Sequence, residues 1–443
     1  MAVKVLVYSL GCPKNQVDLE IMLKKLEAAN FLLVEDFQGA DIAIVNTCAF
    51  IEDAKKESIE SILEAADYKS DGIIKKIIVT GCLAERYRDE IFKEIPLVDA
   101  VLGIGANEDI VAACHAVMEN TKVKSFPPKE KLPLDGSRTL TTPRHYAYLR
   151  IADGCSNHCS FCAIPSIRGA FRSRQMENII EEAKALVEDG ASEIILIAQD
   201  TTRYGEDIYK ENKLPELLLK LCEIEKLKWI RLLYCYPDRI SDELLEVMAT
   251  QSKILKYLDI PIQHASEKIL KAMNRKGDKD SLLSLIEKIR NRIPDIVLRT
   301  TIMTGFPGEA EEEFNTLSEF VNEARFDRLG CFAYSREEGT PASSFENQVD
   351  PETAKNRCEI IMEGQYNIVC ENNKKHIGKT LDVVMEGYDG YSDCFYGRAY
   401  MDAPDIDAQI IFTSNYHIEQ GDIVPVNILA VAETGYDLIG EAV

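Results

Sequence analysis

The stretch Gly154-Cys155-Ser156-Asn157-His158-Cys159-Ser160-Phe161-Cys162 decides the architecture that we expect for this chain. Its three cysteines have the spacing C-x3-C-x2-C and follow a predicted strand, Tyr146 to Ala152. Three thiolates on one short loop can bind three irons of a cubane iron–sulfur cluster and leave the fourth iron open for another ligand. We therefore interpret this loop as an iron–sulfur site.

The spacing, with Phe161 directly before the last cysteine, resembles the signature of the radical S-adenosylmethionine superfamily. An open iron can hold S-adenosylmethionine through its amino and carboxylate groups, and an electron then splits the molecule to give a carbon radical. The alternative is a zinc site that uses the same thiolates with His158. Structural zinc usually takes four ligands in two separated pairs, and the sequence has no second C-x2-C pair.

Around this loop, strand and helix patterns alternate from Tyr146 to about Gly339. This alternation predicts a partial or complete β/α barrel, with its reactive face at the carboxyl ends of the strands. The predicted strands are Tyr146–Ala152, Glu193–Ala198, Trp229–Tyr234, Tyr257–Ile260, Val297–Met303 and Arg328–Tyr334.

The first 118 residues also alternate strands with helices, which predicts a parallel sheet. Leu19, Met22, Leu23 and Leu26 lie on one face of a predicted helix, and Arg86 to Glu94 is predicted to be another short helix. Cys12, Cys48 and Cys82 each stand at the carboxyl end of a predicted strand, the edge where open α/β sheets hold ligands. The three thiols are therefore expected to converge as a second cluster site. The remaining cysteines fit the alternative of small buried apolar residues; they are Cys114, Cys222, Cys235, Cys331, Cys358, Cys370 and Cys394.

Residues 120–143 are rich in proline and are predicted to be a linker. After a helical stretch from Pro351 to Lys375, five short strands predict a small barrel of the oligonucleotide-binding type. This last segment, 376–443, carries twelve acidic and two basic residues, and thus −10 of the total charge of −23. Such a barrel suits a basic protein better than RNA.

The overall composition is that of a globular protein, with 46% hydrophobic residues. No apolar run is long enough to span a bilayer and no signal peptide is recognisable, so we expect a cytoplasmic protein. Thirteen cysteines in such a chain favour metal binding over disulfides. The excess of acidic residues argues against a general nucleic-acid binder.

Four further motifs make the whole chain resemble the methylthiotransferases, radical S-adenosylmethionine enzymes with two clusters. The motifs are Asn46-Thr47-Cys48-Ala49-Phe50-Ile51, Ile164-Pro165-Ser166-Ile167-Arg168-Gly169, Asp259-Ile260-Pro261-Ile262-Gln263-His264 and Gly305-Phe306-Pro307-Gly308-Glu309. The resemblance implies a second-cluster domain at 1–119, a linker at 120–143, a radical S-adenosylmethionine domain at 144–375 and a TRAM domain at 376–443. The expected fold class is α/β with a small all-β barrel at the carboxyl end.

The resemblance also implies the cofactors, two [4Fe-4S] clusters and S-adenosylmethionine. Cys12, Cys48 and Cys82 would hold one cluster, and Cys155, Cys159 and Cys162 the other. Phe161, Gln199 and Arg299 are expected to contact S-adenosylmethionine, and we assign no catalytic acid or base.

One branch of this family modifies an aspartate of the twelfth protein of the small ribosomal subunit, and other branches modify adenosine in transfer RNA. Gly11-Cys12-Pro13-Lys14-Asn15 resembles the ribosomal-protein branch, and the acidic barrel agrees. We therefore expect methylthiolation of the aspartate β-carbon, with an electron donor as a further partner. The alternatives are a transfer RNA methylthiotransferase, which the acidic barrel disfavours, and a metal or iron–sulfur adaptor without catalysis.

Overall fold

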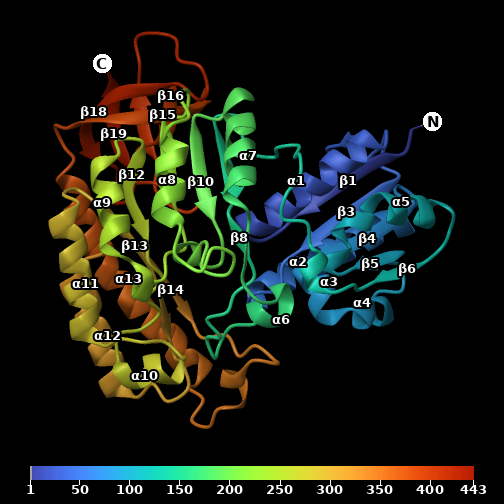
Figure 1. The fold of residues 1–443 in the computed structure, drawn as a ribbon, viewed down its shortest axis with the longest axis horizontal. Coiled ribbons are helices and arrows are strands. Elements are labelled where there is room, and N and C mark those ends of the chain that lie inside the picture. Colours follow the sequence, from blue (N-terminus) through green and yellow to red (C-terminus); the bar gives the residue numbers. More distant parts are fainter. Residues whose placement is uncertain (1) are drawn as a thin grey trace.

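The computed structural model describes residues 2–443 and shows two parallel sheets and a small barrel (Figure 1). The first sheet has the strand order β2-β1-β3-β4-β5-β6 and the central sheet has the order β14-β13-β12-β11-β10-β7. The carboxyl-terminal strands close a barrel in the order β15-β16-β17-β19-β18. The predicted fold class is confirmed.

The strands of the first sheet are all parallel, because helices connect them across the sheet. They are β1 Lys4–Ser9, β2 Leu32–Val34, β3 Ile42–Thr47, β4 Lys76–Gly81, β5 Ala100–Leu102 and β6 Val123–Ser125. The helices are α1 Pro13–Ala28, α2 Glu52–Ser70, α3 Cys82–Tyr87, α4 Asp89–Glu94 and α5 Ile110–Met118. The predicted apolar face of α1, which includes Leu19 and Leu26, is buried in one apolar cluster with α5 and the sheet.

One detail of the sequence interpretation is wrong. The helix predicted from Arg86 to Glu94 is interrupted at Arg88, whose φ of 38° ends α3 and begins α4. The linker also contributes structure, because its residues 123–125 form β6 beside β5 and its residues 129–131 form a 3₁₀ turn. Three-residue edge strands such as β2 and β6 are too short to show a periodic pattern.

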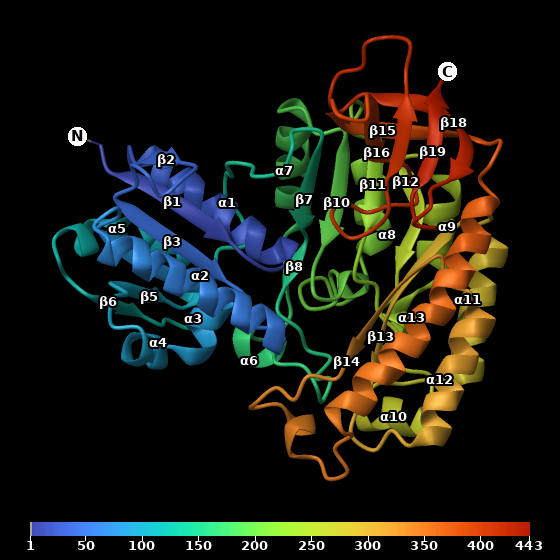
Figure 2. The same ribbon diagram turned by 180° about the vertical axis from the view of Figure 1, so that it is seen from behind.

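The central sheet is also parallel, and β7 and β14 are its edges, so the barrel is partial. Its strands are β7 Tyr146–Arg150, β10 Glu193–Ile197, β11 Trp229–Leu232, β12 Ile254–Asp259, β13 Val297–Thr304 and β14 Arg328–Ala333. The helices around it are α6 Ile164–Arg168, α7 Met176–Glu188, α8 Leu214–Cys222, α9 Asp242–Thr250, α10 Glu267–Ala272, α11 Lys279–Arg292, α12 Glu311–Ala324 and α13 Pro351–Lys374. Figure 2 shows the long helices α11 to α13 along one flank.

The small barrel packs against the inner face of the central sheet, near the amino ends of its strands (Figure 1). Tyr146, Trp229 and Tyr257 of the sheet share one apolar cluster with Val384 and Phe412 of the barrel. The barrel strands are β15 Thr380–Asp389, β16 Cys394–Arg398, β17 Ile410–Thr413, β18 Ile423–Val431 and β19 Leu438–Ala442. The barrel therefore leaves the carboxyl edge of the central sheet to the cysteine loop.

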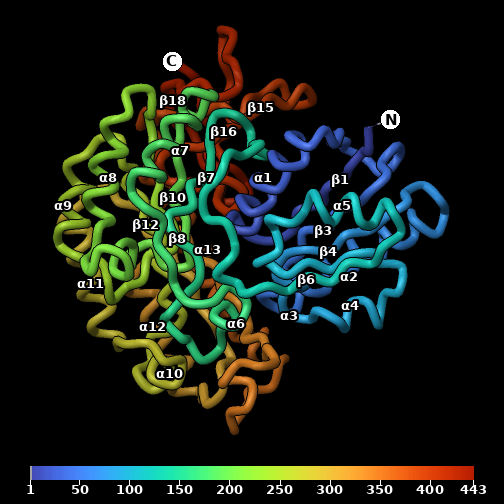
Figure 3. Tube along the Cα trace, turned by 45° about the vertical axis from the view of Figure 1, so that its right-hand side comes forward, coloured from blue at the N-terminus to red at the C-terminus, as the bar shows by residue number. Residues whose placement is uncertain are grey.

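The segment between the two sheets runs along their junction, where Figure 3 shows it in teal and green. It is held by the central domain, because Arg150 Nη2 donates to the carbonyl of Pro133 at 2.8 Å and Arg174 Nε donates to Asp135 Oδ1 at 2.6 Å. The proline-rich stretch is thus anchored to the domain that follows it.

Candidate iron–sulfur sites

The loop with Cys155, Cys159 and Cys162, here called the second triad, follows the two-residue strand β8 Ala152–Asp153. Gly154 begins the loop with φ of 74°, and a Cβ there would lie 2.1 Å from the carbonyl oxygen of Ala170. Only glycine fits this conformation and this close approach. The Cys155 N–H donates to the carbonyl of Gly169 at 3.1 Å, so the start of the loop is fixed.

The thiols of the second triad affect one another's pKa values. Burial raises the pKa of Cys155 to about 11 and that of Cys162 to about 12, and Cys159 contributes to both increases. Arg275 Nη1 lies 3.7 Å from Cys159 Sγ and supplies a positive charge. Thiols with raised pKa values ionise when a cationic metal centre binds, with release of protons. The donor set therefore fits an iron–sulfur cluster.

Cys12, Cys48 and Cys82, here called the first triad, come from three neighbouring strands. Cys12 precedes α1, Cys48 follows β3, and Cys82 is the first residue of α3 directly after β4. The pairings Ser9↔Asn46 and Thr47↔Gly81 align the ends of these strands. The three cysteines therefore stand at the carboxyl edge of the same sheet, and their role as ligands of one cluster stays a prediction.

The thiols of the first triad are close enough to change one another's pKa values. Burial raises the pKa of Cys82 to about 12, and Cys48 and Cys12 add to the increase. Burial opposes ionisation of Cys12 as well, but Lys14, Arg168 and two backbone N–H groups outweigh it, so its pKa lies below the usual value. Cys12 is thus the member of this triad best prepared to be a thiolate.

A buried ionic network joins the two sites. Asp18 of α1 pairs with Arg150 and with Arg168, whose Nη2 lies 2.9 Å from Asp18 Oδ2. Arg168 Nη1 also donates to Asp153 Oδ1 at 3.1 Å, and its Nη2 lies 3.8 Å from Cys82 Sγ. Side chains of Asp18, Arg150, Arg168 and Asp153 are at most 1% exposed. The Arg168 guanidinium therefore contacts both Cys82 of the first triad and Asp153, two residues before Cys155 of the second triad.

The three expected cofactor contacts have protein partners in the structure. Gln199 Nε2 donates to Asp153 Oδ1 at 3.1 Å, and its Oε1 is buried without a partner. Phe161 packs against the apolar cluster of Phe306 beside the loop. Arg299 is shared between Asp259 at 3.1 Å and Asp407 of the small barrel at 3.5 Å. Their contact with S-adenosylmethionine stays a prediction.

Other sequence candidates have structural partners. The buried His264 lies with Nε2 3.1 Å from Glu309 Oε2, and its Nδ1 accepts from the N–H of Ser266. Arg174, which follows the cysteine loop in the chain, is buried and pairs with Asp135 and Glu182. Sequence reasoning missed Asp18 and Asp153, because an acidic residue alone gives no sign of a distant arginine.

No group of three or more histidine, cysteine, aspartate or glutamate side chains in residues 2–443 is placed to hold a single metal ion. A cubane cluster distributes its thiolate ligands over several irons, so this finding does not bear on it.

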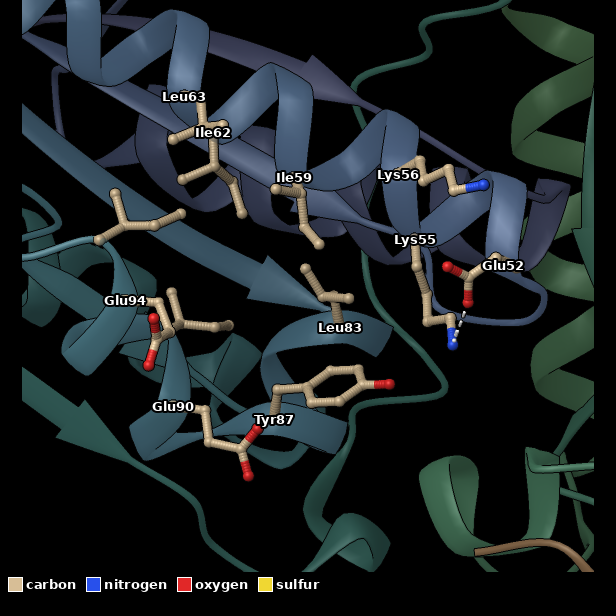
Figure 4. Close-up of a pocket in the computed structure, with 12 residues that line it drawn as sticks. Glu52, Lys55, Lys56, Ile59, Ile62, Leu63, Leu83, Tyr87, Glu90 and Glu94 are labelled. Carbon is tan, nitrogen blue, oxygen red and sulfur yellow. Dashed lines mark ion pairs between the residues drawn. The ribbon is translucent and has the colours of Figure 1, made fainter. Parts of the chain in front are cut away.

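A pocket of about 510 Å³ lies on the first domain, between α2 and the pair α3 and α4 (Figure 4). Ile59, Leu63 and Leu83 form its apolar wall, and Glu90 and Glu94 lie at its rim. No cysteine is among the residues that line it. The pocket is therefore separate from both triads.

Three family models match the chain in succession. Residues 4–103 match the family described as Uncharacterized protein family UPF0004, residues 149–321 match the Radical SAM superfamily, and residues 377–443 match the TRAM domain. The solved structure of the radical S-adenosylmethionine methyltransferase TsrM from Kitasatospora setae has a similar fold, with a TM-score of 0.58 and 12% identity over 83% of this chain and 89% of that one. The fold and the cysteine loop define a radical S-adenosylmethionine enzyme.

Relatives that are similar over the whole length of the chain show to which family of radical S-adenosylmethionine enzymes it belongs. The ribosomal protein uS12 methylthiotransferase RimO of Lachnoclostridium phytofermentans is 48% identical over 99% of this chain and all of that protein. RimO of Caldanaerobacter subterraneus subsp. tengcongensis is 50% identical over 98% of this chain and 99% of that protein. The chain therefore belongs to the RimO family of ribosomal protein uS12 methylthiotransferases. None of the helices in the described part of the chain is long and apolar enough to cross a membrane.

Proposed function

We propose that this chain transfers a methylthio group to the β-carbon of an aspartate in ribosomal protein uS12. The single observation that carries the proposal is the pair of three-thiol sites that border one buried ionic network, in a chain related over its full length to uS12 methylthiotransferases. A β C–H bond is too weakly acidic for a side-chain base, so radical chemistry in a water-excluded site is the practical route.

In this proposal the first and second triads each hold one [4Fe-4S] cluster. When bound, the clusters supply one-electron chemistry with S-adenosylmethionine and a place to hold sulfur. The chain itself supplies thiolates, excludes water through the buried network, and positions the target. Arg168 lies between the sites and neutralises negative charge on both sides, because it contacts Asp18, Asp153 and Cys82.

The proposal includes a docking role for the small barrel. Three of its twelve acidic residues are used internally: Asp402 pairs with Arg328, Asp407 with Arg299, and Glu386 with Arg398. Eight others are exposed, and they are Asp382, Asp389, Asp393, Asp405, Glu419, Asp422, Glu433 and Glu441. The hairpin between β15 and β16 adds Tyr391, which is 100% exposed. Exposed carboxylates beside tyrosine rings suit the lysines and arginines of a basic ribosomal protein.

The substrate is tested with the anaerobically reconstituted holoenzyme, S-adenosylmethionine, reductant and a sulfur source. We expect a methylthio mass gain on the target aspartate when uS12 or intact small subunits are present. A mass gain on transfer RNA together with none on uS12 would overturn the choice of substrate. Stoichiometric zinc without cleavage of S-adenosylmethionine would instead support an adaptor.

The docking role is tested by charge reversal. Asp389→Lys with Asp393→Lys should raise KM for uS12 about tenfold at low salt and leave kcat unchanged, because rim charges act mainly on association. The matched control is Glu57→Lys with Glu60→Lys, two exposed acidic residues of α2. Equal effects of the two pairs would mean that total charge matters and the barrel has no specific part.

A further inference from the structure

The segment of residues 335–342, here called the bridging segment, follows β14 at the carboxyl edge of the central sheet. Its last residue reaches the second triad, because the Ala342 N–H donates to the carbonyl of Ser160 at 2.9 Å. Ser160 lies between Cys159 and Cys162, so this hydrogen bond is made to the cysteine loop itself. The bridging segment is therefore in direct contact with the second triad.

The first half of the bridging segment reaches the first triad. Arg86 of α3 donates from Nη1 to the carbonyl of Ala49 at 3.0 Å, and Ala49 directly follows Cys48. The same Nη1 donates to Glu337 Oε2 at 2.7 Å, and Arg86 Nη2 donates to the carbonyl of Glu338 at 2.8 Å. One guanidinium thus joins the bridging segment to the residue beside Cys48.

Glu337 is held as a carboxylate by cations of the first domain. Only 2% of the residue is exposed, and Lys55 Nζ lies 3.0 Å from the Oε2 that also accepts from Arg86. Burial alone would raise the pKa of Glu337, but hydrogen bonds from Ser335 and the two cations outweigh it, so the pKa lies below the usual value. Figure 4 shows Lys55 near the start of α2, where it also pairs with Glu52 at 2.9 Å. A carboxylate buried between two cations is costly to separate from them.

Both ends of this connection lie beside triad cysteines, at Ala49 and at Ser160. Arg168 makes another connection, because it contacts Cys82 of the first triad and Asp153 before the second. A single connection would leave the two domains free to rotate about it, whereas two connections at different cysteines restrict both their distance and their orientation. The bridging segment is therefore placed to fix how the triads lie relative to each other.

We propose that the bridging segment, held by Glu337, sets the separation of the two triads and so couples radical formation at one triad to methylthio transfer from the other. This inference rests on the proposed function, in which S-adenosylmethionine is cleaved at the second triad and sulfur is held at the first. A substrate radical with no methylthio group within reach gives cleavage without product. Glu337 is a positioning residue, because it acts through Arg86 and the segment and not on the reacting atoms.

The test compares Glu337→Gln with the wild-type holoenzyme in the reaction with uS12. Product formation should fall about 10- to 100-fold, because a displacement of about 1 Å between reacting groups has an effect of this size, and cleavage of S-adenosylmethionine should change by less than about twofold. The number of S-adenosylmethionine molecules cleaved per methylthiolated uS12 should therefore rise. Glu337→Asp, which keeps the charge, should restore part of the coupling.

A second measurement needs no substrate. When both clusters are reduced, the magnetic interaction between them in the electron paramagnetic resonance spectrum reports their separation. In Glu337→Gln this interaction should be weaker or more widely distributed than in the wild type. The iron content should stay at about eight per chain, as expected for two cubane clusters, so that a loss of cluster is excluded.

The matched control is Asp99→Asn. Asp99 is also a buried carboxylate between two cations, Lys69 at 2.5 Å and Lys76 at 3.3 Å. Lys76 begins β4 whereas Cys82 follows its last residue, so this site lies at the edge of the first sheet opposite the triad. Asp99→Asn should lose stability as Glu337→Gln does, but it should keep the wild-type ratio of cleavage to product and the wild-type magnetic interaction.

The outcomes separate the two proposals. If Glu337→Gln keeps the wild-type value of either readout, or if Asp99→Asn changes both equally, the role of the bridging segment is wrong and the proposed function stands. If the wild-type enzyme does not modify uS12, the proposed function itself fails, and the magnetic measurement still decides whether Glu337 sets the separation. If Glu337→Gln does not fold, both measurements are made on Ser335→Ala, a milder variant that removes the hydrogen bond of 2.7 Å from Ser335 Oγ to Glu337 Oε1.

Discussion

Cys155, Cys159 and Cys162 stand on one loop after β8, whereas Cys12, Cys48 and Cys82 stand at the ends of three separate strands. The loop depends on a few local hydrogen bonds and on Gly154. The first triad depends on the register of β1, β3 and β4, so a fault anywhere in these strands would move a thiol. A local site is recognised from spacing, and a dispersed site only from the order of the strands.

The largest expected effect comes from removing one thiol from each triad, which tests whether the two triads have different roles. Cys155→Ala should abolish both cleavage of S-adenosylmethionine and methylthiolation, and Cys12→Ala should abolish only methylthiolation. Each variant should retain about four of about eight irons, because each triad would hold one cubane cluster. Iron analysis and product mass measure these effects.

The control for these substitutions is Cys114→Ala, which removes a buried thiol of α5 that belongs to neither triad. It should keep both activities. Persistence of methylthiolation in Cys12→Ala would show that the first triad has been assigned the wrong role.

The link between the triads is tested next. Asp18→Asn leaves Arg150 and Arg168 without their shared carboxylate in a fully buried place, and we expect a loss of about 3–5 kcal/mol in the free energy of unfolding. Urea denaturation measures the loss. Glu27→Gln, which removes one partner of an exposed ion pair on the same helix, should change stability by less than about 0.5 kcal/mol. Equal losses would mean that the network is not the connection between the sites.

Gly154→Ala tests whether the conformation of the second-triad loop depends on the glycine that begins it. The left-handed φ of 74° and the contact of a Cβ with Ala170 should together lower the free energy of unfolding by about 2–3 kcal/mol. Gly72 has the same φ of 74° but nothing within 4 Å of its Cβ position, so Gly72→Ala should cost only about 1 kcal/mol. If both variants lose the same amount, the close approach at the loop contributes nothing.

The smallest expected effect is on the pH dependence of the free energy of unfolding, and it comes from a histidine that belongs to neither triad. Burial, and next Lys379, lower the pKa of His376 to about 4, so the folded protein holds it neutral. Below an unfolded pKa of about 6.5, the unfolded chain takes up a proton that the folded chain does not, and stability is lost as the pH falls from 6.5 to 4. We expect about 1–2 kcal/mol, after allowance for partial exposure.

His376→Gln should remove this part of the pH dependence, which is measured as the difference between the two denaturation series. At each pH in this range, the variant and the wild-type protein should contain the same amount of iron. An identical pH dependence in the variant would assign the titration to another group.

The sequence predicts the six central strands and the five barrel strands because each has an apolar pattern bounded by turns, and it predicts the sheet edge where the cysteines lie. It does not predict the pairing of Asp18 with Arg168, which are 150 residues apart. Nor does it predict that the barrel fills the inner face of the central sheet, because the alternation of Tyr146 and Tyr148 only indicates that one face is buried. Contacts between distant segments leave no local signal.

Helix α1 has a consequence for the order in which the chain matures. It is made among the first residues, yet Asp18 finds its partners only in Arg150 and Arg168, and Val17 joins an apolar cluster that is completed by Leu438 near the end of the chain. Because domains tend to fold in turn as they leave the ribosome, the first domain must keep a charged and apolar face of α1 open while most of the protein is synthesised. The earliest helix is thus among the last to reach its final surroundings, and a nascent chain that is stalled before residue 376 would expose this face to chaperones.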